Sequence, residues 1–442
     1  MAKKHIDIFT KINMQNILML DLTLKTKPLF AILIGILCAI FLSSFIYFEH
    51  FLNAQNLPIY STLSAIFGFY LYFKLTHLGA FVCGGTIGLL WFYWIALSFR
   101  YYDLSAFIPL ALVGIFCVYG VLFLIFCWFK NPFYRLIALS LSSYIKPFGF
   151  NWFILESIFV KSEFVANFAT LFLSLLIVLI CSLLLHKKFI KSSFLLGGIL
   201  FLSLKFILPS VEQNPQNIAL KIKTIHTKIP QQLRFKQDEL NKILKINFDL
   251  IQVAKQDGYE VVILPETAFP LVLNKSPLLL ESLKEQSKDI TIITGALKES
   301  SGQIFNSAYV FFNGSVTIID KLILVPFGEQ IPFTNILPQS LKKWINKTFF
   351  NGAADFSSND FKEPNTIKIN GIPFNLAICY EATREEFYKN NPQALIAISN
   401  NAWFAPSTQE TLQKLLMLYF AKRFHTTIYH SSNASSDFIL KP

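Results

Sequence analysis

Three residues in the second half of the chain, Glu266, Lys321 and Cys379, have side chains that could together perform nucleophilic catalysis. Each stands directly after a short apolar segment of the kind that forms a buried strand. A cysteine is mostly protonated at neutral pH, so a nucleophilic cysteine needs a base or a nearby cation. A carboxylate could take the thiol proton, and a lysine could stabilise an oxyanion. Taken singly, the three residues also fit ordinary roles as a solvated turn residue, a surface lysine and a core cysteine.

The segments around these residues predict an α/β domain over 218–442, which follows a short polar linker at 210–217. An amphipathic helix is indicated at 238–258, and Asn313-Gly314 indicates a hairpin turn. Mixed sheets faced by helices fit this order of elements. Strands are predicted at 218–229, 260–266, 291–297, 306–320, 374–381 and 394–400.

Cys379 differs from the other cysteines in its surroundings. It is alone in the second half of the chain, so either the domain faces a reducing compartment or the thiol is kept free for chemistry. A helix predicted at 383–391 would start just after Cys379, and the partial positive charge of its N-terminus would favour the thiolate. The other five lie in apolar runs, where cysteine usually acts as a small hydrophobic side chain: Cys38, Cys83, Cys117, Cys127 and Cys181.

The first 209 residues have the composition of a membrane protein. The chain is 53% hydrophobic and 16% aromatic, and nearly all of its long apolar runs precede residue 210. A membrane-spanning helix needs about 20 apolar residues. We therefore expect a membrane all-α bundle of about seven transmembrane helices over 1–209. The expected spans are 29–48, 58–75, 80–99, 107–129, 132–147, 164–186 and 192–209.

The positive charge of the chain lies mainly between these apolar runs. Residues 1–209 contain 15 Lys and Arg against 6 Asp and Glu, whereas residues 210–442 contain 24 against 21. A nucleic-acid-binding protein would concentrate basic residues on its soluble part, so no nucleic-acid partner is expected. With seven spans, eleven basic residues fall on one side of the membrane and four on the other. This bias predicts a cytoplasmic N-terminus and an extracytoplasmic α/β domain, with no cleavable signal peptide.

Four strings in the second half carry a family resemblance: ILPETAFP, DKLILVPFGEQIPF, AICYE and ISNNAWF, in this order. They resemble the carbon-nitrogen hydrolase (nitrilase) superfamily, whose catalytic set is Glu, Lys and Cys. The apolar half narrows the resemblance to the apolipoprotein N-acyltransferase family, in which a helical bundle precedes the hydrolase-like domain. The strings GLLWFYWIALSF, GFNWFILES and IPQQLRFKQ also look like segments of that family. The resemblance implies a nitrilase-like α-β-β-α sandwich.

Carried over by motif, the resemblance makes Glu266 the general base, Lys321 the oxyanion stabiliser and Cys379 the nucleophile. Glu329 would orient the lysine, and Glu381 would support the loop of the nucleophile. Candidates for the walls of the substrate and acyl pocket are Phe327, Tyr380, Trp403, Trp344, Phe349 and Phe350. Residues 344–350 could dip into lipid as a lid or arm, or could pack as an ordinary core segment.

The resemblance implies a ping-pong reaction without metal or cofactor. Cys379 would take an acyl chain from a phospholipid, with phosphatidylethanolamine as the expected donor, and form a thioester. The acceptor would be the N-terminal amine of a diacylglyceryl-modified apolipoprotein, in the last step of lipoprotein maturation. The protein would be a monomer in the bacterial inner membrane, in contact with membrane lipids, and its catalytic domain would be periplasmic.

Two departures from the family pattern and three alternatives accompany this interpretation. The family usually has Trp at the position of Leu264, so a substrate-facing aromatic is expected to be missing or displaced. The sequence stops at SSNASSDFILKP, so the family's last transmembrane helix is expected to be absent. A membrane-anchored amidase acting on a small extracytoplasmic amide would use the same three residues. A transporter with a non-catalytic soluble domain would be expected to have ionisable groups at the centres of its spans, and few are present. A papain-like cysteine enzyme would need His425 or His430, and neither lies in a recognisable motif.

Overall fold

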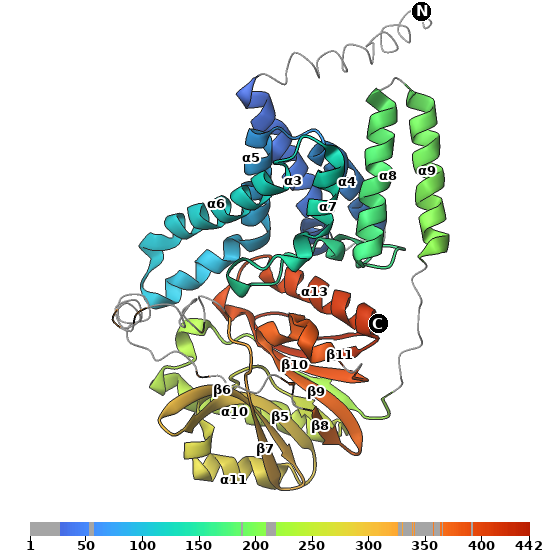
Figure 1. Cartoon of the computed structure of the whole chain (residues 1–442). Coiled ribbons are helices and arrows are strands. Elements are labelled where there is room, and N and C mark those ends of the chain that lie inside the picture. The colour runs from blue at the N-terminus through green and yellow to red at the C-terminus, as the bar shows by residue number, and fades with distance from the viewer. Residues whose placement is uncertain are drawn as a thin grey trace, which may run out of the picture.

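The structure is a computed structural model that describes residues 27–52, 57–186, 189–208, 218–325, 366–389 and 392–442, with a few isolated residues between 326 and 365. Figure 1 shows that the helices of the first half gather on one side and two β-sheets on the other, with helix α13 between them. The catalytic candidates therefore belong to a sheet-based domain that lies directly against the helical half.

Four of the described helices of the first half are long and apolar enough to cross a membrane: Pro28–Phe51, His77–Tyr101, Ser105–Phe126 and Phe168–Leu185. The second of these consists of α5 and a 3₁₀ continuation, η1 (Tyr93–Tyr102). The bounds of the helices are α3 Pro28–Phe51, α4 Leu57–Tyr72, α5 His77–Phe92, α6 Ile108–Phe126, α7 Pro132–Ser140, α8 Phe168–His186 and α9 Ile190–Ile207. Helix α4 has 16 residues and is therefore about 24 Å long.

The prediction of a spanning helix at 132–147 is wrong. Helix α7 has only nine residues, about 14 Å, which is less than half the thickness of a hydrocarbon core. It ends at Ser140 in a run of serines, where the Ser143 hydroxyl bonds to the Glu156 carboxylate and accepts from the backbone of Leu155. Short 3₁₀ turns, at Ser142–Tyr144, Pro147–Gly149 and Leu155–Phe159, continue the chain toward the sheets.

Helices α3, α5 and α6 pack closely because small residues lie where they meet. A Cβ added to Gly84 in α5 would lie 2.1 Å from the carbonyl oxygen of Tyr119 in α6, so only glycine permits this approach. Without a hydrophobic force between helices in lipid, such close van der Waals contact is a main source of their association.

The second half contains two six-stranded sheets. The first has the order β1-β3-β5-β6-β7, with β4 also paired to β5, and the second has the order β12-β11-β10-β9-β8, with β2 paired to β11. Strands β1, β3 and β5 are mutually parallel, as are β9, β10 and β11, so each sheet has one edge where several carboxyl ends meet. The first sheet consists of β1 Ile222–Thr224, β3 Val261–Ile263, β4 Phe269–Val272, β5 Thr291–Ser300, β6 Gln303–Phe312 and β7 Ser315–Asp320. The second consists of β2 His226–Thr227, β8 Thr366–Ile369, β9 Ile372–Ile378, β10 Ala394–Asn400, β11 Thr427–Asn433 and β12 Phe438–Leu440.

The layers are helix, sheet, sheet and helix, as the resemblance implied. Helices α10 (Gln237–Gln256) and α11 (Pro277–Gln286) cover the outer face of the first sheet through one apolar cluster. A second cluster fills the space between the two sheets. Helix α13 (Gln409–Phe424) covers the outer face of the second sheet.

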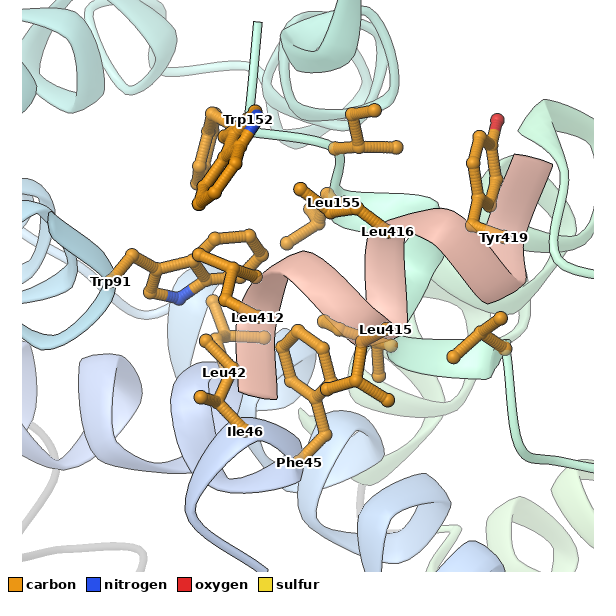
Figure 2. Close-up of a cluster of buried hydrophobic side chains, with 14 of the residues drawn as sticks. Leu42, Phe45, Ile46, Trp91, Trp152, Leu155, Leu412, Leu415, Leu416 and Tyr419 are labelled. Atoms are coloured by element: carbon orange, nitrogen blue, oxygen red, sulfur yellow. The ribbon is translucent and has the colours of Figure 1, made fainter. Parts of the chain in front are cut away.

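Helix α13 is buried on two sides because it also packs against the helical half. Figure 2 shows Leu412 and Leu415 of α13 near Trp91 of α5 and Phe45 of α3. Leu416 of α13 lies beside Leu155 of the 3₁₀ turn Leu155–Phe159. Polar contacts accompany this packing, since His50 Nδ1 lies 2.7 Å from Thr411 Oγ1. The same apolar cluster thus joins the membrane helices to the second sheet.

Most of the predicted elements of the second half are confirmed. The amphipathic helix and the strands around 261, 291, 306–320 and 394–400 are present, and the hairpin turns at Asn313 and Gly314, with φ of 47° and 76°. The helix predicted at 383–391 is wrong in its described part. Only two short 3₁₀ turns, Cys379–Thr383 and Glu385–Tyr388, follow β9.

Candidate active site

The two sheets bring the three predicted catalytic residues to one edge of the sandwich. Glu266 follows β3 and Lys321 follows β7 in the first sheet, whereas Cys379 follows β9 in the second. Lys321 Nζ lies 3.6 Å from Glu266 Oε1, and the charges of both residues act on the Cys379 thiol. The sequence placed each residue at a strand end, and the packing of the sheets makes them neighbours.

Glu266 stands on a tight turn that the neighbouring strand supports. Thr267, the next residue, has a left-handed φ of 50°, a strained conformation for a β-branched residue. Strand β5 approaches this turn so closely that a Cβ on Gly295 would lie 2.6 Å from the Glu266 Cα. The backbone N–H of Gly295 also donates to the carbonyl of Pro265 at 3.1 Å. The turn thus fixes where the Glu266 carboxylate leaves the backbone.

Lys321 is held between two carboxylates. Only 1% of its surface is exposed, and its Nζ donates to Glu329 Oε1 at 2.8 Å while it faces Glu266 at 3.6 Å. Burial alone would lower the pKa of Lys321, but Glu329 and Glu266 outweigh burial and raise the pKa above its usual range. The lysine is therefore a permanent cation in this site.

Asn306 is a site residue that the sequence reasoning missed. Its Nδ2 donates to Glu266 Oε1 at 2.7 Å and to Glu329 Oε1 at 3.1 Å, so it connects the two carboxylates that flank the lysine. Its backbone carbonyl accepts from the backbone N–H of Lys321 at 2.8 Å. Asn306 therefore holds both carboxylates in place, together with the backbone from which the Lys321 side chain leaves.

Cys379 occupies a strained position where β9 ends. Its φ is 56°, and the residue is partly exposed. Burial and then the Glu266 charge raise the pKa of the Cys379 thiol, against the opposing effects of Lys321 and of a backbone N–H hydrogen bond from Asn400. The expectation that a helix N-terminus favours the thiolate is therefore wrong, because only a five-residue 3₁₀ turn begins here. The resting thiol is protonated, and a nearby base is needed to activate it.

Glu381 links the strand ends of the two sheets. Its Oε1 accepts from the backbone N–H groups of Leu322 and Ile323, at 2.6 and 2.9 Å, just after Lys321. Its Oε2 accepts from the backbone N–H of Ile378 at 2.8 Å, just before the nucleophile. Burial raises the pKa of Glu381 to about 7, although Lys321 and these hydrogen bonds oppose the shift. One side chain thus sets the spacing between the lysine and cysteine loops.

Comparison with known proteins identifies the family. A family model described as "Apolipoprotein N-acyltransferase integral membrane domain" matches residues 29–205, and one described as "Carbon-nitrogen hydrolase" matches residues 228–428. An apolipoprotein N-acyltransferase of Wolinella succinogenes is 40% identical over 92% of this chain and 95% of that protein. Those of Helicobacter pylori and Campylobacter jejuni are 36% and 34% identical, over 84% and 91% of this chain and 85% and 88% of those proteins. The chain belongs to the apolipoprotein N-acyltransferase family.

In this member of the apolipoprotein N-acyltransferase family, a loop of the membrane half contacts the loop of the nucleophile. The Phe150 ring stacks on the Tyr380 ring at 5.6 Å, and the backbone N–H of Asn151 donates to the Tyr380 hydroxyl at 3.1 Å. Trp152 Nε1 donates to Thr383 Oγ1 at 2.6 Å. Tyr380 is therefore packed at the junction of the two halves, and its role as an acyl-pocket wall stays a prediction.

The other predicted pocket residues have mixed outcomes. Trp403 is partly exposed beside Tyr101 of the membrane half, with ring centroids 5.5 Å apart. Four further candidates lie outside the described residues: Phe327, Trp344, Phe349 and Phe350. The lid predicted at 344–350 lies there as well.

The positions of Leu264, His425 and His430 bear on two further expectations. Leu264 is fully buried in the cluster under α10 and α11, so this position points away from the catalytic edge, and the expected gap in the substrate wall is wrong. His430 Nε2 lies 2.9 Å from Ser399 Oγ, and burial lowers the pKa of His430 to about 3. His425 is exposed beyond the end of α13. These placements favour Glu266, and no histidine, as the base for Cys379.

Two observations concern ligands around the site. Among the described ranges, no group of three or more His, Cys, Asp or Glu side chains could hold a metal ion. A cavity of about 640 Å³ lies between Tyr101 of the membrane half and residues 228–232, and none of Glu266, Lys321 and Cys379 lines it. Ala402 and Ser435 line the same cavity, so it is bordered by the ends of β10 and β11.

Proposed function

We propose that this protein transfers an acyl chain from a membrane phospholipid to the N-terminal amine of a diacylglyceryl-modified apolipoprotein. The loop of the nucleophile contacts the membrane half through Tyr380 and Thr383, directly after Cys379, and this observation carries the proposal. Both substrates are anchored by acyl chains, so the thiol must be held at the bilayer surface. The names of the curated relatives support the same reaction.

In the first half-reaction, the Cys379 sulfur attacks the ester carbonyl of the phospholipid, for which we propose phosphatidylethanolamine. Glu266 takes the thiol proton, which the raised pKa of the thiol makes necessary. Lys321 stabilises the oxyanion of the tetrahedral intermediate. Glu266 then gives its proton to the departing glycerol oxygen, which leaves a lysophospholipid and a Cys379 thioester.

In the second half-reaction, the amine of the acceptor attacks the thioester carbonyl. Glu266 accepts the proton of the amine, Lys321 again stabilises the oxyanion, and the Cys379 sulfur leaves as the amide forms. The sulfur is reprotonated from Glu266, which restores the resting site. Glu329 and Glu381 act through the positions of Lys321 and of the nucleophile loop.

We place residues 1–209 in the bacterial inner membrane, residues 210–217 as a linker and residues 218–442 as a periplasmic catalytic domain. The five lysines before the first span support a cytoplasmic N-terminus. The periplasmic placement of the catalytic domain rests on the resemblance to the family, because the seven-span count behind the charge argument included residues 132–147, which form no spanning helix. We further propose that the protein acts as a monomer, because base, lysine and nucleophile all come from one chain.

Intact-protein mass spectrometry tests the first half-reaction. We expect purified protein with phosphatidylethanolamine in mixed micelles to gain the mass of one acyl chain, and hydroxylamine to remove it as expected for a thioester. Cys379→Ala serves as the matched control and should gain nothing. An adduct that is absent from the wild type, or present in Cys379→Ala, would overturn the proposal.

The second half-reaction separates an acyltransferase from a membrane-anchored amidase. The isolated acyl-protein should persist in buffer and discharge when a diacylglyceryl-modified N-terminal peptide is added, with the acyl chain recovered as an amide of the peptide. Discharge at the same rate with and without the peptide would mean that water is the acceptor.

A further inference from the structure

Arg234 is a buried cation that the proposed chemistry leaves without a role. It follows η6 (Gln231–Leu233), and only 1% of its surface is exposed. Its Nη2 donates to the carbonyl oxygen of Glu266 at 2.6 Å and to that of Thr267. Its Nη1 has no hydrogen-bond partner within the described part of the chain. Burial of an incompletely paired cation is costly, so this placement calls for a benefit elsewhere in the molecule.

The two carbonyl groups that Arg234 binds belong to the turn that presents the general base. This turn leaves the strand ladder, and Thr267 is strained within it, with a φ of 50°. Gly295 of β5 closes on the turn from one side, and Asn247 of α10 donates to the next carbonyl, that of Ala268, at 2.6 Å. Arg234 therefore supplies hydrogen bonds that stabilise the strained backbone conformation of Glu266 and Thr267.

Three residues before Arg234, Gln231 contacts the other sheet. Gln231 Oε1 accepts from Asn400 Nδ2 at 2.8 Å, and Asn433 Nδ2 donates to Asn400 Oδ1 at 3.0 Å. Asn400 ends β10, which pairs in parallel with β9, the strand that leads to Cys379. The short segment 231–234 thus touches the turn of the base on the first sheet and the strand end beside the nucleophile on the second.

The charge of Arg234 also acts on the site. Burial lowers the pKa of Arg234 to about 10, against the opposing effect of Glu266, so the guanidinium stays charged at neutral pH. The other charged groups that face Glu266 are Lys321, which is a cation, and Glu329 beyond it. Arg234 is therefore a second cation, besides Lys321, near the buried carboxylates of Glu266 and Glu329.

We propose that residues 231–234 form a strut between the two sheets, in which Arg234 is a positioning residue that sets the Glu266 carboxylate relative to the Cys379 thiol. Arg234 contacts the backbone of the base and does not reach the reacting atoms. The strut matters because a displacement of about 1 Å between reacting groups can slow a reaction about 100-fold. This inference rests on the proposed roles of Glu266 and Cys379.

The test compares Arg234→Gln, Arg234→Lys and Gln231→Leu with the wild type, and uses Lys236→Gln as a matched control. Lys236 is an exposed cation two residues after Arg234, outside the strut. The measurements are the rate of acyl-protein formation from phosphatidylethanolamine micelles over pH 5.5–9, alkylation of Cys379 by iodoacetamide, and the apparent melting temperature.

We expect Arg234→Gln to form the acyl-protein about 100-fold more slowly at saturating phospholipid, with an unchanged half-saturating concentration. In the pH profile of this rate, the acid limb (the fall in rate toward low pH) should move to higher pH in Arg234→Gln. The reason is that loss of a nearby cation disfavours the ionised carboxylate of Glu266. Arg234→Lys should recover the acid limb and part of the rate, and alkylation should stay within about twofold in every folded variant, as the thiol itself is untouched. A purely structural role would lower the melting temperature without moving the acid limb.

A wild-type rate and acid limb in Arg234→Gln would overturn the strut. If Arg234→Gln does not fold, Gln231→Leu decides: slower acyl-protein formation in the folded variant supports the strut, and an unchanged rate overturns it. If the wild-type protein forms no acyl adduct, the proposed function is overturned. If the wild type and the strut variants form the adduct at the same rate, only the strut is overturned.

Discussion

Lys321→Met separates the two roles that Lys321 could have, charge balance and oxyanion stabilisation. At an effective dielectric constant of about 20, the attraction of Lys321 Nζ is about 6 kcal/mol to Glu329 at 2.8 Å and about 5 kcal/mol to Glu266 at 3.6 Å. Desolvation of the buried ammonium offsets much of this attraction. Removal of one partner of a buried ion pair costs a net of about 3–5 kcal/mol. We therefore expect a clearly lower apparent melting temperature for Lys321→Met.

The double variant Lys321→Met/Glu329→Gln removes the cation together with the carboxylate closest to it. Glu266 keeps its hydrogen bond from Asn306, so a large part of the lost melting temperature should return. The first half-reaction should not return, because the lysine donor to the oxyanion is still missing. Loss of one such donor slows a reaction about 10²–10³-fold.

The assay is the rate of acyl-protein formation measured by intact mass, beside the melting temperature of the same samples. Cys379 alkylation by iodoacetamide shows that the nucleophile is still present and accessible in each variant. Acyl-protein formation that recovers to the wild-type rate in the double variant would refute the oxyanion role. Lys321 would then serve only to balance the two carboxylates.

Three further changes test the surrounding geometry. Glu266→Gln removes a charge that raises the pKa of the Cys379 thiol, so the pH profile of alkylation should move to lower pH while acyl-protein formation falls; an unmoved profile would mean that Glu266 is not beside the thiol. Gly295→Ala would place a Cβ 2.6 Å from the Glu266 Cα and should slow acyl-protein formation about 100-fold, whereas Gly114→Ala, with open space around it, should be neutral in the same assay. Glu381→Gln places an amide donor against a backbone N–H, which costs about 1–3 kcal/mol, and should lower both the melting temperature and the rate; an unchanged rate would exclude Glu381 from positioning the lysine and cysteine loops.

The strand ends that carry the site could be predicted because each is marked by local sequence. A buried apolar segment stops at Pro265 before the glutamate, and another stops directly before the cysteine. The hairpin even contains information that the sequence reasoning did not use. Counting outward from the Asn313-Gly314 turn pairs Asn306 with Lys321, and the structure has this register. Asn306 could therefore have been found as a neighbour of the lysine.

Arg234 and the fifth membrane segment could not be predicted in the same way. Nothing near Arg234 in the sequence distinguishes a buried arginine from a surface one, because its carbonyl partners come from a turn more than thirty residues later. The run 132–147 is apolar enough for a span, but its helix ends after nine residues, and Ser143 beyond this end bonds to Glu156 and accepts from the backbone of Leu155. Both features depend on contacts between distant parts of the chain.

The distribution of contacts between the two sheets indicates why the site needs connecting side chains. The nucleophile and helix α13 belong to the second sheet, which the Trp152–Thr383 hydrogen bond and the packing of α13 attach to the membrane helices. The base and the lysine belong to the first sheet, on the far side of a largely apolar interface. A shift of the membrane half would therefore carry the thiol with it and leave the base behind. Glu381 and the 231–234 strut cross this interface with hydrogen bonds, so they are the elements that can keep the catalytic distances constant while lipid substrates enter and leave.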